Sequence, residues 1–317
     1  MITNNMNSYG TLIDLQVNGY GGIDFSAQDL TVEQVVYVCQ LLQSKGTSRF
    51  LATLVSSPVE LYERNLATIK EAMQEDEIAG RLIAGFHIEG PFISEKDGAR
   101  GAHDKRFICK PDKKMLKCIL EAGRPLVRML TIAPELTGIE DIIAMAKDEN
   151  IIISMGHTLA DASQIERAIE KGASCVTHLG NGIPLMLHRT DNPIFVFLAQ
   201  AGLTIMLITD GHHLPIPFIR TVIKTCGIDN IVVTSDSAPL AGMPPGSYVS
   251  LGGEVVLEPD GRLYIPSQGC LAGSSACIAE CADYLSLYVD LSKEEIKQIT
   301  SNNPMRLIGL SDYNDAS

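Results

Sequence analysis

Eight short runs of apolar and β-branched residues recur along this chain, separated by loops or by longer stretches with helical periodicity. The runs are apolar on both sides and show no clean period of two, which is typical of parallel strands that helices cover. Eight strand-then-helix units predict an α/β fold, a TIM-type (β/α)8 barrel. The runs are Leu12–Val17, Phe50–Leu54, Leu82–Ile88, Leu126–Thr131, Ile151–Met155, Ser174–Thr177, Thr204–Thr209 and Ile231–Thr234.

Helix starts between the runs support this order. Thr31-Val-Glu-Gln34 has the form of a capping box and predicts a helix through Leu42. Asp161-Ala-Ser-Gln164 resembles a second one and opens a helix that stops near Gly172. Two shorter helical stretches are Glu140–Lys147 and Pro215–Thr225.

The length of 317 residues is normal for such a barrel, and 45% hydrophobic residues suffice for one large core, so we expect a single domain over residues 1–317. Two segments interrupt the alternation. Gly90–Asp112 forms a long loop after the third run, and loops of that length are usually functional. After the eighth run, Glu254–Leu257 and Arg262–Ile265 flank Pro259-Asp260-Gly261, which predicts a β-hairpin inserted near residues 254–265.

Charge and composition exclude several classes of partner. The net charge of -13 argues against nucleic acid, whose phosphates require clustered Lys and Arg, although it does not exclude a small anion. Met1–Gly10 has neither a basic start nor an apolar segment, and no apolar run approaches the ~18 residues of a membrane span. The eight cysteines are dispersed without a C-x-x-C pair, which indicates reduced thiols in a cytoplasmic protein.

Polar residues gather where the predicted strands end, which is where barrels of this type carry their catalytic groups. Five of the seven histidines lie at strand ends, and the other two lie in the loops that follow. One carboxylate and two imidazoles can hold a divalent ion and leave room for water and substrate. The best such trio is Glu89, His157 and His178, and Asp236 is then free to act on the water.

Each of these residues also has an ordinary structural interpretation. A lone histidine at a strand end is more often a hydrogen-bonded structural residue, and Asp236 could simply cap the segment after the eighth strand. Because all four residues converge on one barrel mouth, we favour the metal site.

An ordered set of motifs then resembles a known family over residues 11–309. The motifs are Ile13-Asp-Leu-Gln-Val-Asn-Gly-Tyr-Gly-Gly22, Phe86-His-Ile-Glu-Gly-Pro-Phe92, Gly101-Ala-His103, Met155-Gly-His157, Thr177-His-Leu-Gly-Asn181, Thr209-Asp-Gly-His-His213, Ser235-Asp-Ser-Ala-Pro239 and Leu271-Ala-Gly-Ser-Ser275. Together they are similar to the N-acetylglucosamine-6-phosphate deacetylase family of the amidohydrolase superfamily.

This resemblance implies a role for each matching residue. Glu89, His157 and His178 would hold the metal, Asp236 would be the catalytic acid/base, and His103 would polarise the amide carbonyl. The residues that would contact the sugar phosphate are Ala102, Asn181, Gly182, Arg189, His213, Leu271, Ala272 and Gly273.

The first strand bears on the number of metal ions. Many amidohydrolases carry His-x-His there and bind two metals, whereas this chain has Gln16 and Asn18, as in the single-metal branch. Side-chain amides are poor ligands for Zn²⁺ or Fe²⁺. We therefore expect one divalent ion per subunit, either Zn²⁺ or Fe²⁺.

Three features depart from the family pattern. Family members usually start earlier and extend past the last helix, and those two ends pair into a small β-sandwich. Here the first run starts at Leu12 and the chain ends at Ser317, so we expect that sandwich to be absent. The usual aromatic residue and Ala around Asn181 are replaced, and the loop Ile93–Arg100 is slightly longer than usual. The last two changes border the sugar site.

The expected reaction is the hydrolysis of N-acetylglucosamine 6-phosphate to glucosamine 6-phosphate and acetate. One alternative is a different N-acyl amino sugar, either N-acetylgalactosamine 6-phosphate or an unphosphorylated sugar. A second is a noncatalytic sugar-phosphate-binding protein, although a binding module has no need of the four residues of the metal site. Family members are commonly dimers, which makes a homodimer one expectation of the resemblance.

Overall fold

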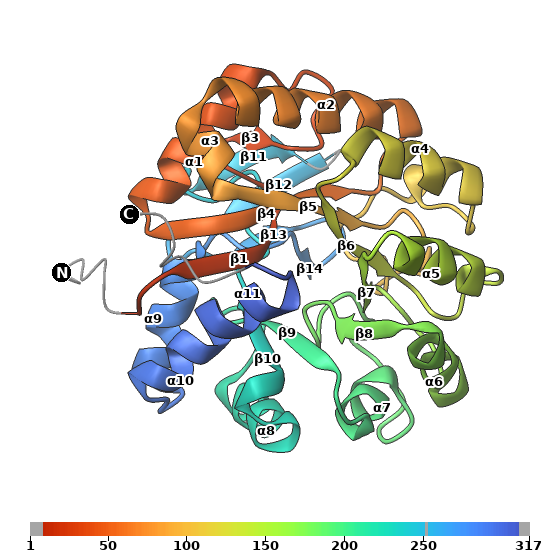
Figure 1. Ribbon diagram of the computed structural model, residues 1–317. Helices are drawn as coiled ribbons and strands as arrows, with labels where there is room; N and C mark the ends of the chain where they lie inside the picture. The colour runs from red at the N-terminus through yellow and green to blue at the C-terminus, as the bar shows by residue number, and fades with distance from the viewer. Residues whose placement is uncertain (1–8, 251–252, 311–317) are drawn as a thin grey trace.

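The structure is a computed structural model that describes residues 9–250 and 253–310. Eight parallel strands curl around a central axis, and helices surround them (Figure 1). Each strand pairs with its neighbour in the chain, which confirms the predicted (β/α)8 barrel. The strands are β1 (Leu12–Val17), β4 (Thr47–Val55), β5 (Ile83–Glu89), β6 (Val127–Ile132), β7 (Ile152–Met155), β8 (Ala173–Val176), β9 (Thr204–Ile208) and β10 (Ile231–Thr234).

The first and last strands meet through a parallel bridge between Val17 and Ser237. Beside that bridge, buried Asp14 accepts hydrogen bonds from the Thr234 hydroxyl, at 2.7 Å, and from the Ser235 backbone N–H, at 3.0 Å. Burial outweighs these bonds and raises the pKa of Asp14. These contacts join the two ends of the barrel sheet at the level where β10 stops.

The two helices with predicted capping boxes begin where the sequence indicates. Thr31 caps α1 and Asp161 caps α6, each with both hydrogen bonds of a capping box. Caps of this kind are worth about 0.5–2 kcal/mol each. The helices are α1 (Val32–Ser44), α2 (Val59–Glu75), α3 (Glu77–Leu82), α4 (Lys113–Gly123), α5 (Ile139–Asp148), α6 (Ala162–Lys171), α7 (Pro193–Ala199), α8 (Ile216–Cys226), α9 (Ile278–Tyr288), α10 (Lys293–Lys297) and α11 (Asn303–Leu307). Short 3₁₀ turns span Lys105–Phe107 and Ile228–Asn230, and a π-helical turn spans Gln298–Asn302.

Two apolar clusters fill the barrel. The larger one lies between the strands and the surrounding helices. The smaller one fills the barrel interior, where Ile308 from the end of α11 joins residues from the strands. Its strand members are Ile13, Leu15, Leu51, Ala84, Met129, Cys175, Met206 and Val232. In a barrel with a packed interior, the chemistry is carried at the C-terminal ends of the strands. Here that is the end opposite α11.

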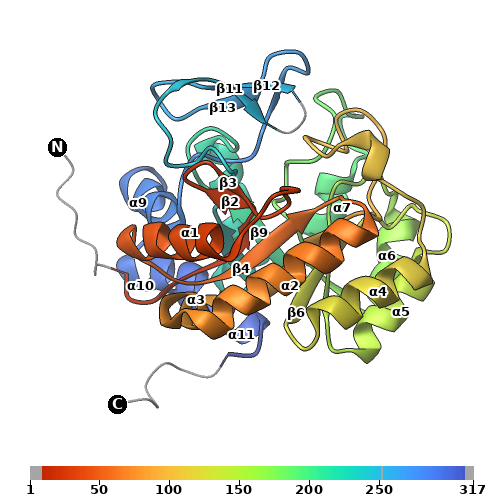
Figure 2. The ribbon, with the colours of Figure 1, turned by 90° about the horizontal axis from the view of Figure 1, so that it is seen from above.

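A small antiparallel sheet lies at the other end of the molecule from α11 (Figure 2). Its strands are β11 (Gly246–Ser250), β12 (Gly253–Leu257), β13 (Leu263–Ile265) and β14 (Cys270–Leu271). β12 and β13 run antiparallel across the segment for which we predicted a hairpin. One face of the sheet packs against Ala238 and Leu240, so this sheet is fixed beside the end of β10.

Other predictions concern what the chain lacks. Outside the barrel, the strands in the described residues are the sheet β11–β14 and a hairpin of β2 (Gly19–Tyr20) and β3 (Ile23–Asp24), and no β-sandwich accompanies them. All eight cysteines are free. Within the described residues, no helix is both long and apolar enough to cross a membrane. Most of the segment Met1–Gly10 lies outside the described residues.

Candidate metal centre and active site

Glu89, His157 and His178 converge at the end of the barrel opposite α11. Glu89 is the last residue of β5, and the two histidines stand two residues beyond β7 and β8. The Nε2 atoms of His157 and His178 lie 3.2 Å and 3.0 Å from Glu89 Oε1, and all three side chains are buried. One ligand atom from each residue fits within 4.8 Å of the others. The predicted trio is therefore together in space.

The backbone after each strand turns these histidines over the barrel. His157 has a φ of 50° and His178 a φ of 29°, in the left-handed region that residues other than glycine rarely adopt. Such strain persists where the surrounding structure holds it, and it clusters at functional sites. Asp236, which follows β10, shares this conformation with a φ of 52°.

The hydrogen bonds of His157 fit a metal ligand. Its Nδ1 lies 2.8 Å from the backbone carbonyl oxygen of Ala99, which can only accept, so Nδ1 carries a proton. The lone pair of a neutral His157 then sits on Nε2 and faces the Glu89 carboxylate at 3.2 Å. Two acceptors at that distance repel unless a cation lies between them. One carboxylate and two imidazoles are a donor set that suits a divalent transition metal.

His103 completes the cluster from the long loop after β5. Its ring is 4.5 Å from the His157 ring, and its Nε2 lies 3.6 Å from Glu89 Oε2. Burial lowers the pKa of His103. Burial alone would raise the pKa of Glu89, but hydrogen bonds from the surrounding imidazoles, first that of His103, hold it well below its usual range. The site therefore combines an ionised carboxylate with a neutral imidazole.

Asp236 lies near the same cluster, close enough to interact electrostatically with Glu89 and His178. Burial, followed by the negative charge of Glu89, raises the pKa of Asp236 to about 6. Asn18 Nδ2 donates a hydrogen bond of 2.7 Å to Asp236 Oδ1. A carboxyl group with a pKa near neutrality can both accept and return a proton.

His87, which the sequence also places near the end of the third run, has a structural role. Its ring faces the interior below Glu89, with Nε2 2.8 Å from Thr131 Oγ1 and Nδ1 3.1 Å from the Leu15 carbonyl oxygen. Burial lowers its pKa to about 4. His87 thus belongs to a buried polar layer that supports the cluster.

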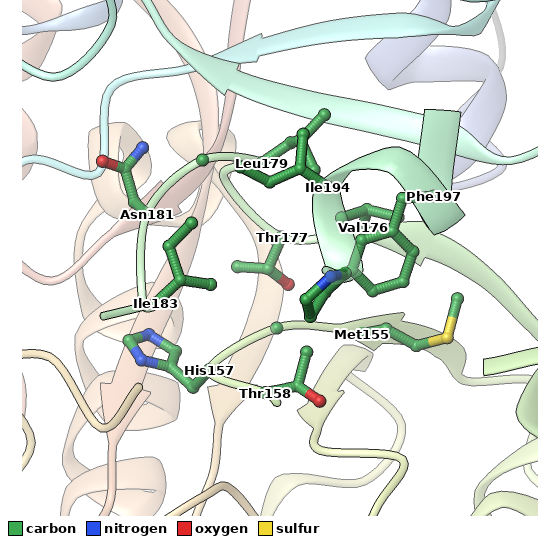
Figure 3. Close-up of a pocket in the computed structure, with 13 residues that line it drawn as sticks. Met155, His157, Thr158, Val176, Thr177, Leu179, Asn181, Ile183, Ile194 and Phe197 are labelled. Carbon is green, nitrogen blue, oxygen red and sulfur yellow. The ribbon is translucent and has the colours of Figure 1, made fainter. Parts of the chain in front are cut away.

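Asn181 and Gly182 lie in the loop that covers His157. Figure 3 shows this region, with His157, Ile183 and Asn181 on one side of the pocket and Ile194 and Phe197 of α7 on the other. Asn181 Nδ2 donates to the His178 carbonyl oxygen at 3.2 Å. Gly182 has a φ of 60°, and a Cβ there would lie 2.7 Å from His157 Nδ1. Asn181 is therefore bonded to the backbone of His178, and the absence of a side chain at Gly182 leaves room for the His157 ring.

The segment Leu271-Ala272-Gly273 lies beside Asp236. Ser274 donates its backbone N–H to the Asp236 carbonyl oxygen at 3.0 Å, and Ala238 donates to the Ser274 carbonyl oxygen at 2.8 Å. A Cβ at Gly273 would lie 3.1 Å from the same Asp236 oxygen. Ala272 and Ala102 both pack in the apolar cluster of the small sheet. The small sheet thus carries one wall of the site.

His213 and Arg189 differ in how the structure holds them. His213 Nδ1 lies 2.8 Å from Asp210 Oδ2, and Asp210 also accepts from the backbone N–H groups of His212 and His213. Arg189 is exposed on the loop before α7. Among the described residues, no contact joins it to the trio of Glu89, His157 and His178. The structure therefore brings His213, and not Arg189, into a fixed position.

Sequence reasoning missed several supporting residues. Gln16 Nε2 donates to Glu89 Oε1 at 2.7 Å, although the sequence indicated only that Gln16 is a poor metal ligand. The hydroxyl of Ser56, just after β4, lies 2.9 Å from His103 Nδ1, and no sequence signal marked it. The acidic residue in Asp210-Gly-His-His213 was visible, but its hydrogen bonds were not.

Known proteins resemble this chain over most of its length. A family model for the amidohydrolase family matches residues 10–315. The N-acetylglucosamine-6-phosphate deacetylase of Bacillus subtilis is 31% identical over 303 residues, which cover 95% of this chain and 75% of that protein. The human protein of the same name is 32% identical over 308 residues, with 94% and 73% covered. The crystal structure of N-acetyl-D-glucosamine-6-phosphate deacetylase from Mycobacterium smegmatis superposes with a TM-score of 0.85 at 27% identity, covering 95% of this chain and 78% of that one.

Proposed function

The chain belongs to the amidohydrolase family, and we propose that it is an enzyme that hydrolyses N-acetylglucosamine 6-phosphate to glucosamine 6-phosphate and acetate. The observation that carries this proposal is the convergence of Glu89, His157 and His178 with Asp236 at one barrel mouth. The named relatives, which match over most of the chain, support the substrate.

Glu89, His157 and His178 would hold one divalent ion, Zn²⁺ or Fe²⁺. When bound, such an ion acts as a Lewis acid on an amide carbonyl and lowers the pKa of water. The amides Gln16 and Asn18 occupy the first-strand positions and are hydrogen-bonded to Glu89 and Asp236, which supports a single ion. The remaining steps belong to the side chains around the trio.

Asp236 would serve as the acid/base. It takes a proton from the water that attacks the amide carbon and returns that proton to the amine nitrogen as the C–N bond breaks. With its pKa raised to about 6, the carboxylate is mostly ionised at neutral pH and is still basic enough to accept a proton. Proton transfer by a positioned group of this kind is typically worth about 10²–10⁴ in rate.

His103 would donate a hydrogen bond to the carbonyl oxygen, where negative charge develops. Its Nε2 faces the cluster, 3.6 Å from Glu89 Oε2. Loss of one donor to a developing oxyanion costs about 10²–10³ in rate. On the sugar side, the wall formed by Asn181, Gly182, His213 and Leu271-Ala272-Gly273 would contact the substrate, with Ala102 beside it.

Arg189 would contact the phosphate, since its planar guanidinium offers two donors to phosphate oxygens. The Arg189→Ala variant is expected to raise KM for the phosphorylated sugar about 10–100-fold, because charge-assisted hydrogen bonds contribute about 1.5–3 kcal/mol. The matched control is Arg167→Ala, which removes an arginine from the outer face of α6. Turnover of the free sugar should not change in either variant.

The proposal is tested by one deacetylation screen with metal analysis of the same preparation. Substrates are the 6-phosphates of N-acetylglucosamine and N-acetylgalactosamine and both free sugars. The expected result is the highest kcat/KM on N-acetylglucosamine 6-phosphate, with one ion per chain. A preference for a free sugar or for N-acetylgalactosamine 6-phosphate would contradict the proposed substrate. Binding of a sugar phosphate without turnover of any of the four sugars would indicate a sugar-phosphate-binding protein.

We further propose that the protein is cytoplasmic and forms a homodimer. We also propose that the barrel and the β11–β14 sheet form one domain. Eight free cysteines suit a reducing compartment. The apolar cluster around Ala238, Leu240 and Ala272 joins the small sheet to the barrel. Size-exclusion chromatography at several protein concentrations tests the dimer, and a concentration-independent monomer would contradict it.

A further inference from the structure

We infer that Ser56 is a positioning residue that fixes the tautomer of His103, so that the His103 proton sits on Nε2 and faces the substrate. The inference rests on the proposed deacetylation, in which this N–H donates to the amide carbonyl. It goes further, because it names the residue that makes His103 a hydrogen-bond donor instead of a metal ligand.

Both contacts between Ser56 and His103 reach Nδ1. Ser56 Oγ lies 2.9 Å from Nδ1, and the Ser56 backbone N–H points at the same atom over 3.4 Å. A backbone N–H can only donate, so Nδ1 must be an unprotonated acceptor. Among the described residues the Ser56 hydroxyl has no other acceptor, and its proton is therefore also directed at Nδ1. The single ring proton must then lie on Nε2.

The same reasoning gives the opposite result for the neighbouring ring. His157 Nδ1 faces the Ala99 carbonyl oxygen at 2.8 Å, so its proton is on Nδ1 and its Nε2 lone pair is free for an ion. His103 Nε2 also faces Glu89, at 3.6 Å, and the two rings are 4.5 Å apart. His103 is not in the group whose ligand atoms all lie within 4.8 Å of one another, although its ring borders that group. A nitrogen that carries a proton has no lone pair for a metal, so Ser56 assigns His103 the role of a donor.

Local packing holds Ser56 in this position. Its side chain is buried, and it stands directly after β4, beside the residue that follows Glu89. That residue is Gly90, where a Cβ would lie 2.4 Å from Ser56 Oγ. The next serine behaves differently, since the Ser57 hydroxyl donates to the Val55 carbonyl oxygen at 2.9 Å. Ser57 thus offers a matched control of the same type and similar burial.

The kinetic test compares Ser56→Ala, Ser56→Thr and Ser57→Ala in metal-loaded enzyme. Ser56→Ala keeps the long backbone contact to Nδ1, so the proton on Nε2 is only partly disfavoured. We therefore expect kcat to fall about ten-fold, which is less than the roughly 10²–10³ that complete loss of an oxyanion donor costs. KM should stay within two-fold of the wild-type value, and the metal content should not change. Ser56→Thr, which keeps the hydroxyl, should restore kcat, and Ser57→Ala should match the wild type. Wild-type turnover in Ser56→Ala, or an equal loss in Ser57→Ala, would overturn the inference.

A spectroscopic test does not depend on activity. In ¹⁵N-histidine-labelled protein loaded with diamagnetic Zn²⁺, the His103 signals are assigned by their loss in His103→Gln. We expect an unprotonated Nδ1 and a protonated Nε2 in the wild type, and averaged signals in Ser56→Ala. A protonated Nδ1 in the wild type would refute the inference even if the enzyme is active. If the protein shows the expected tautomer but has no deacetylase activity, the proposed function is refuted and the assignment of the His103 proton is not.

Discussion

Asn18 Nδ2 donates a hydrogen bond of 2.7 Å to Asp236 Oδ1 and so ties the end of β1 to the residue that follows β10. The Asn18 backbone N–H also donates to the Ser237 carbonyl oxygen at 2.9 Å, which fixes the amide beside the carboxylate. With Oδ1 engaged as an acceptor, Oδ2 remains for the proton that Asp236 would transfer in the proposed reaction. Asn18 thus presents Asp236 in a defined orientation.

Asp236→Asn should therefore lose nearly all deacetylation while it retains the metal. An amide of the same shape cannot accept the proton of the attacking water, and kcat should fall by about 10²–10⁴. Asp236 is not in the trio that would hold the ion, so elemental analysis should still find it. In Asn18→Ala the carboxylate remains, and the loss should be smaller. Unchanged turnover in Asp236→Asn would remove this residue from the catalytic role.

Loss of either histidine of the trio should release the ion. His157→Ala and His178→Ala each remove one of three ligands, so affinity should fall by more than the roughly 10–100-fold that loss of an outer partner costs. Elemental analysis after dialysis against a weak chelator measures this. The exposed His188, whose Nδ1 accepts the Asp191 N–H at 2.9 Å, provides the control His188→Ala. If both variants kept their full metal content, the assigned site would be wrong.

The barrel could be predicted because its signals are local. Each apolar run predicts one strand, and the capping boxes at Thr31 and Asp161 mark the helix starts that the structure shows. Strand ends of a parallel barrel share one mouth, so the fold alone predicts that Glu89, His157 and His178 lie close together. The small sheet was predicted only in part, because β11 is mostly polar and exposed and β14 has only two residues, so neither leaves an apolar pattern.

What escaped prediction depends on contacts between distant segments. His87 and Glu89 lie two residues apart on one strand, and only the closed barrel shows that His87 faces a buried layer with Thr131. Asn18 and Asp236 are 218 positions apart, and Ser56 and His103 are 47 apart. Hydrogen bonds across such separations follow from the register of the strands and the course of the loops, which residue types alone do not specify.

Gly182→Ala should weaken metal binding, although residue 182 is not a ligand. A Cβ at this position would lie 2.7 Å from His157 Nδ1, where it would disturb the hydrogen bond to Ala99. We expect metal affinity to fall about 10–100-fold, as for other partners of ligand histidines. Gly202→Ala is the matched control, because Gly202 also has a positive φ, of 82°, but no atom lies within 4 Å of the added methyl. Equal affinities in both variants would show that the contact has no effect.

Stability should depend on pH through Asp210. Burial raises the pKa of Asp210, but the charge of His213 and the hydrogen bonds of His212 and His213 outweigh it, so the net pKa lies below its usual range. A carboxyl group with a lowered folded-state pKa stabilises the fold above its unfolded pKa of about 3.9, and this contribution is lost as the pH falls below that value. Asp210→Asn keeps an acceptor for the two backbone N–H groups but cannot ionise.

The free energy of unfolding in urea should therefore fall more steeply between pH 5 and pH 3 in the wild type than in Asp210→Asn. Both proteins are measured with a chelator present, so that acid release of metal does not contribute. Asp141→Asn is the control, because Asp141 forms an exposed ion pair with Lys113 at 3.0 Å, and such pairs contribute little. Parallel curves for the wild type and Asp210→Asn would mean that the Asp210–His213 contact does not stabilise the folded protein.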